Sequence, residues 1–130
     1  MILVDSSVWI DFVNARETVQ TLRLRAILGV EQVAMGDLIL AELLQGCRDK
    51  KVFNRTLDIL HRLDFVSLGG YRLCLAAACN YRRLRSLGYT VSKTIDAIIA
   101  TRCIISGYTL LHNDKDFIPF EKHLGLKCAT

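Results

Sequence analysis

The chain opens with residues 1–12, MILVDSSVWIDF, in which an apolar run leads directly into a carboxylate. The segment from Ile2 to Val4 is short and continuously apolar, which is typical of a strand buried on both faces of a parallel sheet. Asp5 ends that strand, and two serines follow it. Asp5 could cap the helix expected from Ser7 to Val13, or it could be a ligand for a cation.

Further short apolar segments alternate with helical patterns along the rest of the chain. Strands are expected at 31–35, 65–68, 109–112 and 126–128, and helices at 14–28, 37–45, 49–63, 71–87, 94–106 and 119–123. Short apolar strands between helices predict an α/β fold whose parallel sheet is covered on both faces.

Local signals predict where several helices begin and end. Asn14 with Glu17 three residues later resembles a capping box, so a helix is expected to start there. Asp49 is expected to cap another helix, and Pro119 suits the first turn of the short helix near the end of the chain. Gly107 is a plausible stop for the helix before it.

The size and composition of the chain predict one globular domain over residues 1–130. An apolar fraction of 52% with 23% charged residues supports a single core, and no apolar run is long enough to span a bilayer. A core-like strand follows Met1 at once, without the features of a signal peptide, so we expect a cytoplasmic protein.

The cysteines and the net charge give weaker indications. The odd cysteine count and the absence of CxxC spacing favour structural thiols over a disulfide framework or a zinc site; the cysteines are Cys47, Cys74, Cys79, Cys103 and Cys128. The net charge of +4 permits a polyanionic partner without requiring one.

Several carboxylates occur where strands end or helices begin. They are Asp5, Asp96, Asp114 and Asp116, with Glu42 in the second turn of a helix. Ligands of parallel α/β sheets gather at the carboxyl ends of the strands, so these acids could meet at one edge. Taken singly, each aspartate also has an ordinary explanation as a helix cap, a partner of the helix dipole or a turn residue.

Glu42 is the hardest of these acids to explain as an ordinary surface residue. Leucine, isoleucine and alanine residues occupy 38–41 and 43–44 around it, and no cation stands one turn away. A buried carboxylate without a partner costs several kcal/mol, so it either takes a proton or finds a cation. A narrow solvent-facing strip on this helix remains the alternative.

Converging acids would be stabilised by a divalent cation. An all-oxygen set of ligands favours Mg²⁺ or Mn²⁺ over zinc, and such ions catalyse phosphodiester hydrolysis. Without the five acids, the chain has 17 basic against 8 acidic residues, which suits a nucleic-acid backbone. Candidate phosphate contacts are Arg82, Arg83, Arg85, Lys93 and Lys115, with a second basic group at Arg48, Lys50 and Lys51. All of these could equally be solvated helix ends.

The chain resembles PIN-domain ribonucleases, and most closely the VapC-type toxins of bacterial toxin–antitoxin pairs. The resemblance rests on four segments in order: MILVDSSVWIDF at 1–12, LILAELLQG at 38–46, TIDAIIATRC at 94–103 and TLLHNDKDF at 109–117. It implies a three-layer α/β/α fold with about five parallel strands. It also implies a Mg²⁺- or Mn²⁺-dependent endoribonuclease that hydrolyses RNA.

The resemblance also implies roles for individual residues. The acids that match the family's catalytic, metal-binding positions are Asp5, Glu42, Asp96 and Asp114. Asp116 matches a further acid near the metals. Ser6 matches a serine or threonine close to the first aspartate, and we expect it to orient Asp5 or a water on the metal.

Family members of this kind form homodimers and are inhibited by a cognate VapB-type antitoxin. The dimer surface is therefore expected on apolar helix faces, with Leu40, Leu43, Leu44 and the segment 75–79 as candidates. Core packing is the alternative for all of them. A PIN-like module that binds RNA or a partner without cutting remains the alternative function. A phospho-signalling receiver domain does not fit, because no second acid is adjacent to Asp5 and VSLGG at 66–70 contains none.

Overall fold

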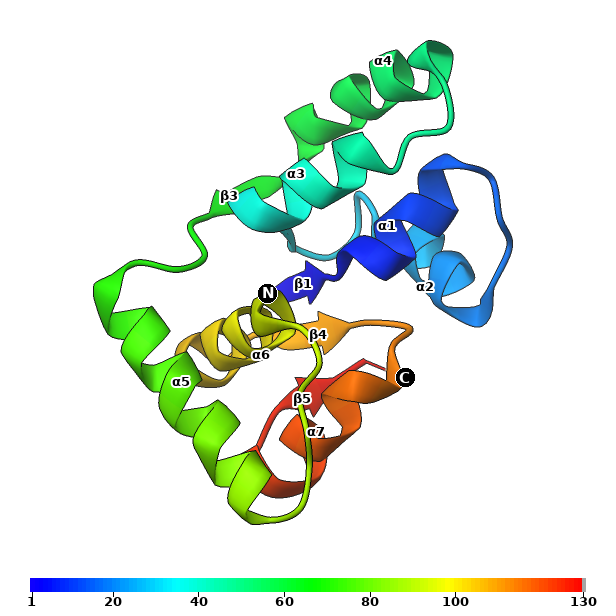
Figure 1. Cartoon of the computed structure of the whole chain (residues 1–130). Coiled ribbons are helices and arrows are strands. Elements are labelled where there is room, and N and C mark those ends of the chain that lie inside the picture. Colours follow the sequence, from blue (N-terminus) through cyan, green and yellow to red (C-terminus); the bar gives the residue numbers. More distant parts are fainter. Residues whose placement is uncertain (130) are drawn as a thin grey trace.

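The computed structural model describes residues 1–129 and contains one five-stranded sheet (Figure 1). Its strands are β1 (Ile2–Val4), β2 (Val33–Gly36), β3 (Asp64–Val66), β4 (Thr109–Leu111) and β5 (Lys127–Cys128). They lie in the order β3-β2-β1-β4-β5, and each neighbouring pair is parallel. The expected α/β fold is confirmed. The domain end expected at residue 130 falls on Thr130, outside the described residues.

The opening segment forms the central strand, as its apolar character predicts. Leu3 of β1 pairs with Ala34 on one side and with Leu110 on the other, and all three side chains are fully buried. Every residue of β2 is buried as well. Continuous burial is possible because helices cover both faces of a parallel sheet, so no side of these strands needs to be polar.

Within residues 1–129, seven α-helices and two 3₁₀ turns connect the strands. The helices are α1 (Ser6–Val13), α2 (Val19–Ile27), α3 (Asp37–Gln45), α4 (Lys50–Ile59), α5 (Tyr71–Ser86), α6 (Thr94–Ser106) and α7 (Ile118–Leu124). The 3₁₀ turns are η1 (Leu60–Arg62) and η2 (Lys115–Phe117). In Figure 1, α1 to α4 lie to one side of the central strands and α5 to α7 to the other.

The chain reverses its direction across the sheet between its two halves. It runs outward from β1 through β2 to β3, then crosses back through α5 and α6 to β4 and continues to β5. Right-handed crossovers in opposite directions place the two helix groups on opposite faces. The order therefore switches between β1 and β4, and the crevice at the carboxyl ends of these two strands is where such folds bind ligands.

The start of α2 differs from the expectation. Asn14 follows the last residue of α1, and its side chain donates a hydrogen bond to the Gly46 carbonyl (3.0 Å) instead of opening a helix. The helix begins after Thr18, where Thr18 and Thr21 form a capping box by exchanging side-chain to backbone hydrogen bonds. The Asn14–Glu17 prediction was wrong because a second, tighter cap lies four residues further along.

One candidate for the dimer surface is part of the core. Leu43 is fully buried, whereas Leu40 and Leu44 are only partly buried. On α5, by contrast, Leu75 is 52% exposed. Across residues 1–129, the structure has no helix that combines the length and the apolar character needed to cross a membrane.

Candidate functional site

The carboxyl ends of the two central strands are held together where the topology switches. Asp5 follows β1 directly, and its backbone N–H donates a hydrogen bond to the carbonyl of Leu111, the last residue of β4 (2.9 Å). The chain then continues from Leu111 to Asp114 within three residues. The sheet thus brings acids far apart in sequence to one edge.

Three aspartates form what we call the acidic cluster: Asp96, Asp114 and Asp116. Each contributes one carboxylate oxygen to a group in which all oxygens lie within 4.8 Å of one another. Asp96 comes from the first turn of α6, while Asp114 and Asp116 come from the segment after β4. Asp116, expected as a supporting residue, therefore belongs to the same cluster as Asp96 and Asp114, which were expected to bind the metal.

Asp96 shows that positive charge does not fully balance the acidic cluster. The residue is only 5% exposed, and its Oδ2 has no hydrogen-bond partner among the described residues. Burial raises the pKa of Asp96 to about 7, and the negative charges of Asp5, Asp114 and Asp116 contribute in the same direction. The Lys93 ammonium opposes them but is not sufficient to restore the ordinary value.

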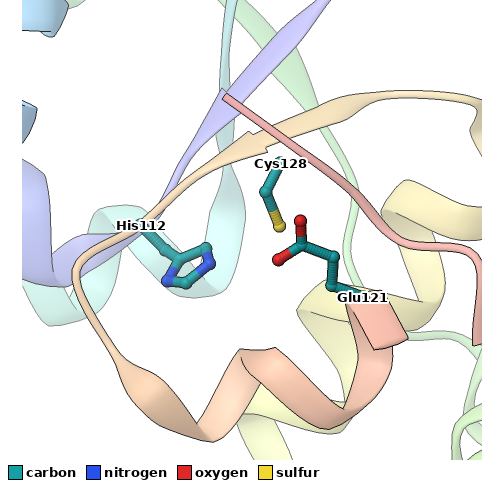
Figure 2. Close-up of side chains that lie close together, drawn as sticks. All are labelled: His112, Glu121 and Cys128. Carbon is teal, nitrogen blue, oxygen red and sulfur yellow. The ribbon is translucent and has the colours of Figure 1, made fainter. Parts of the chain in front are cut away.

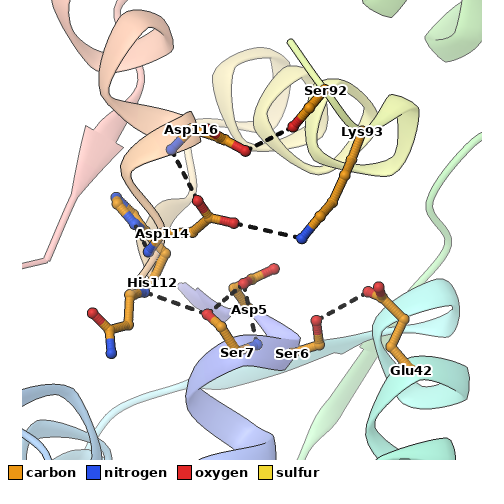
Figure 3. A network of polar contacts seen from close by, with 10 residues as sticks. Asp5, Ser6, Ser7, Glu42, Ser92, Lys93, His112, Asp114 and Asp116 are labelled. Carbon is orange, nitrogen blue, oxygen red and sulfur yellow. Dashed lines mark hydrogen bonds and ion pairs between the residues drawn. The ribbon is translucent and has the colours of Figure 1, made fainter.

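Asp5 adjoins the acidic cluster and is fixed by Ser7. The carboxylate is 4% exposed, and its Oδ2 accepts hydrogen bonds from the Ser7 hydroxyl (2.6 Å) and from the Ser7 backbone N–H (3.2 Å) (Figure 3). The Ser7 hydroxyl in turn accepts from the N–H of Asn113 (3.4 Å). Asp5 is thus the cap of α1, and its other carboxylate oxygen makes neither of these bonds.

Ser6 contacts a different acid from the one expected. Its hydroxyl donates to Glu42 Oε1 (3.0 Å), so Ser7, and not Ser6, orients Asp5. The reason is local geometry: the first two residues of α1 point in different directions, about 100° apart. Glu42 is half-buried on α3 and lies outside the acidic cluster. Figure 3 shows its contact with Ser6, the residue that follows Asp5 in the chain.

The segment before α6 supplies two further polar contacts. Ser92 donates its hydroxyl hydrogen to Asp116 Oδ2 (2.9 Å), and Lys93 Nζ lies 3.8 Å from Asp114 Oδ2 (Figure 3). Asp116 also donates its backbone N–H to Asp114 Oδ1 (2.9 Å). Sequence reasoning missed Ser92 and Ser7, because a serine near an acid in the chain is too common a pattern to single out.

The other basic candidates lie outside the acidic cluster. Arg82, Arg83 and Arg85 are exposed on α5, and Lys115 is exposed in η2. Arg82 lines a groove of about 310 Å³ between α5 and α6. The same groove is lined by Thr94 and Ala97, which are close to Asp96 in the sequence of α6.

The site as a whole offers hard oxygen ligands and a deficit of positive charge. Mg²⁺ and Mn²⁺ prefer such ligands, and Mg²⁺ usually combines a few carboxylates with water. The buried, unpaired oxygen of Asp96 fits this requirement, because a cation would satisfy it and offset the charges that raise its pKa. The residues present therefore suit a hard divalent cation.

Two known ribonucleases are similar to this chain in sequence. VapC ribonuclease Mb1587 from Mycobacterium bovis is 29% identical over 132 residues, covering 100% of this chain and 98% of that protein. Ribonuclease VapC11 from Mycobacterium tuberculosis matches with the same identity and coverage. Both similarities extend over the whole length of the chain.

Solved structures share the fold. VapBC2 from Rickettsia felis, bound to a DNA fragment from its promoter, superposes with a TM-score of 0.74 at 23% identity, covering 99% of this chain and 98% of that one. FitAcB from Neisseria gonorrhoeae gives a TM-score of 0.70 at 19% identity, covering 100% and 97%. The family model described as "PIN domain" matches residues 2–122. The resemblance seen in the four sequence segments is confirmed, and the chain belongs to the PIN domain family.

Proposed function

We propose that the chain is a Mg²⁺- or Mn²⁺-dependent endoribonuclease that hydrolyses phosphodiester bonds in RNA and is inhibited by a cognate VapB-type antitoxin. One observation carries the proposal: Asp96, Asp114 and Asp116 converge beside Asp5 at the switch point of the sheet, with a buried, unpaired oxygen on Asp96. The ribonuclease names of the similar VapC proteins support the same assignment.

The proposed ligands of the cation are Asp5, Asp96 and Asp114, with Asp116 beside them. Ser7 fixes Asp5 in one orientation, and the N–H of Asp116 does the same for Asp114. Glu42, held by Ser6, is assigned to the far side of the site, where it would order water and complete the acidic set. When bound, the cation supplies a water of lowered pKa and neutralises charge on the phosphate.

Lys93 is the proposed phosphate contact closest to the chemistry. Its side chain is 61% exposed, and its ion pair with Asp114 is long at 3.8 Å. Such an exposed pair contributes little stability. The ammonium is therefore free to leave Asp114 for the RNA backbone once the acids are neutralised. Further contacts are proposed for Arg82, Arg83, Arg85 and Lys115.

The partners are proposed on the exposed part of α5. Leu75 is 52% exposed, and Ala78 and Cys79 are exposed beside it, which leaves apolar surface without cover in a single chain. We assign this surface to a homodimer or to the antitoxin. The solved relatives with the same fold include complexes of VapB with VapC.

An RNA cleavage assay tests the proposed function. Purified chain, freed of antitoxin, should cleave RNA with Mg²⁺ or Mn²⁺ and should stop in EDTA. Asp96→Asn should abolish cleavage, because it removes a charged ligand while conserving the shape of the side chain, and Asp5→Ala should do the same. Asp58→Asn, an exposed acid on α4, is the matched control and should cleave like the parent.

Two results would contradict the proposal. Cleavage that continues in EDTA would exclude the metal mechanism, and cleavage at the parental rate by Asp96→Asn would exclude the assigned site. RNA binding without cleavage under all metal conditions would instead support the non-catalytic PIN-like module.

A further inference from the structure

A second group of potential metal ligands lies beside β4 and β5, apart from the acidic cluster. His112, Glu121 and Cys128 each offer one ligand atom, and these three atoms lie within 4.8 Å of one another. Figure 2 shows the imidazole, the carboxylate and the thiol pointing into one space. We propose that these three residues form a binding site for a divalent transition metal ion, with Zn²⁺ the best chemical match.

The three ligands come from three elements that the sheet aligns. His112 follows the last residue of β4, Cys128 ends β5, and Glu121 lies on α7, which connects the two strands. Cys128 pairs with Leu110 in the parallel ladder, so the thiol and the imidazole project from neighbouring strands. The ligands are separated by seven residues or more, which is why the sequence shows no zinc-binding spacing.

The spacing of the three atoms suits a tetrahedral ion. At metal–ligand distances of about 2.0–2.3 Å, the ligand atoms around zinc lie roughly 3.3–3.8 Å apart. A group already within 4.8 Å therefore needs side-chain adjustments of about an ångström. Glu121 is exposed and can make such a movement, whereas the His112 ring packs against the buried Phe117 ring, with their centroids 4.9 Å apart.

The donor types separate this site from the acidic cluster. A thiolate, an imidazole and a carboxylate favour borderline or soft ions such as Zn²⁺, while aspartates alone favour Mg²⁺ or Mn²⁺.

The proposed ion would also act on the segment that carries the acidic cluster. His112 Nδ1 accepts a hydrogen bond from the backbone N–H of Asp114 (3.1 Å), so Nε2 is the nitrogen available to an ion. A neutral ring that accepts at Nδ1 carries its proton on Nε2. Binding through Nε2 places the proton on Nδ1 instead, and the Asp114 N–H then loses its acceptor and must move.

Metal titrations of the full chain test the site. In excess Mg²⁺, added to fill the acidic cluster as the proposed function requires, Co²⁺ should bind in one equivalent with a thiolate-to-metal charge-transfer band, and Zn²⁺ should remove the band. Cys128→Ser should abolish the band, and Glu121→Gln, an exposed change that leaves the core intact, should weaken Co²⁺ binding at least about tenfold. Cys79→Ser, an exposed cysteine on α5, and Asp96→Asn are the controls and should retain the band.

The outcomes separate this site from other sources of binding. A missing band in the parent, a band that survives Cys128→Ser, or one lost in Cys79→Ser would overturn the proposal. Loss of the band in Asp96→Asn would place the ion in the acidic cluster and would overturn it as well. By NMR, saturating Zn²⁺ should shift the amide resonance of Asp114, and an unchanged resonance would exclude His112 as a ligand.

Discussion

The Asp96 carboxylate combines the strongest signs of function with a cost in stability. It is buried, and one of its oxygens is unpaired among the described residues. Burial, together with the charges of three other acids, raises its pKa to about 7. Buried groups that are strongly perturbed by charged neighbours concentrate at functional sites. Without a cation, the folded chain therefore tolerates this residue best when it is protonated.

The stability of the metal-free chain should depend on pH through Asp96. The pKa is raised from 3.8 to about 7 on folding, so the folded state binds this proton more tightly than the unfolded state does. The stabilising contribution is complete below about pH 4 and is lost as the pH rises to about 7. One pKa unit corresponds to about 1.4 kcal/mol, so the loss is at most roughly 4 kcal/mol. Urea unfolding in EDTA between pH 4 and 8 measures it.

Asp96→Asn isolates this effect from the titration of other groups. The variant should lose less stability than the parent between pH 4 and 7, and at pH 8 it should be the more stable of the two. If the free energies of unfolding of parent and variant changed in parallel with pH, Asp96 in the folded state would ionise as easily as an exposed carboxyl, and the prediction would be wrong.

Part of the site could be predicted from single residues, and part required the fold. Asp5 and Asp114 stand at strand ends and Asp96 at a helix start, so topology alone predicts that they approach one edge. The hydrogen-bonding partners were not predictable in the same way. Whether Ser6 or Ser7 bonds to Asp5 depends on the direction of each side chain in the first turn of α1, which residue type does not reveal.

At the scale of the element, two capping boxes are possible at the start of α2: Asn14 with Glu17, as the sequence suggests, or Thr18 with Thr21, as in the structure. Thr18→Ala removes the side chain that accepts from the Thr21 N–H, and helix caps of this type are worth about 1 kcal/mol. The variant should lose roughly that amount in urea unfolding, with an unchanged m value. Far-ultraviolet circular dichroism checks that the rest of the fold is retained.

Glu17→Ala is the matched control, because an Asn14–Glu17 capping box would make Glu17 the important residue. Glu17 is exposed and precedes the cap, so its substitution should change the stability by less than about 0.5 kcal/mol. A larger loss for Glu17→Ala than for Thr18→Ala would mean that the helix starts earlier than the structure has it.

Helix ends were predicted correctly where only one residue nearby could cap or end the helix. Asp49 caps α4 through the Val52 N–H, and Gly107 ends α6 in the left-handed conformation, both as expected. Where a segment contains two plausible caps, as 14–21 does, tertiary contacts determine which one starts the helix. The Asn14 side chain donates to the carbonyl of Gly46, which is distant in the sequence, and it does not cap α2.

At the scale of the whole molecule, charge is distributed unevenly around the doubly wound sheet. The acids at the carboxyl edge account for five of the 13 acidic residues, which leaves the rest of the surface basic. A surface of this kind attracts an RNA backbone, and the proposed cation would remove the repulsion at the site itself. RNA binding should therefore depend steeply on salt, through the basic residues nearest the acids.

Salt dependence of RNA binding can locate the basic surface that is used. Asp96→Asn provides a background without cleavage, in which binding is measured by fluorescence anisotropy at increasing KCl. Replacing Arg82, Arg83 and Arg85 with Gln should weaken binding and reduce the slope of log K against log [salt] by up to about 2, since each phosphate contact to a single strand contributes about 0.7.

The control replaces Arg48, Lys50 and Lys51 with Gln. It changes the net charge equally, but at the start of α4, where Arg48 already pairs with Asp49 (3.7 Å). Equal slopes for the two triple variants would indicate that RNA responds to net charge alone, whereas a reduction confined to the α5 variant would place the RNA path along α5 toward Asp96.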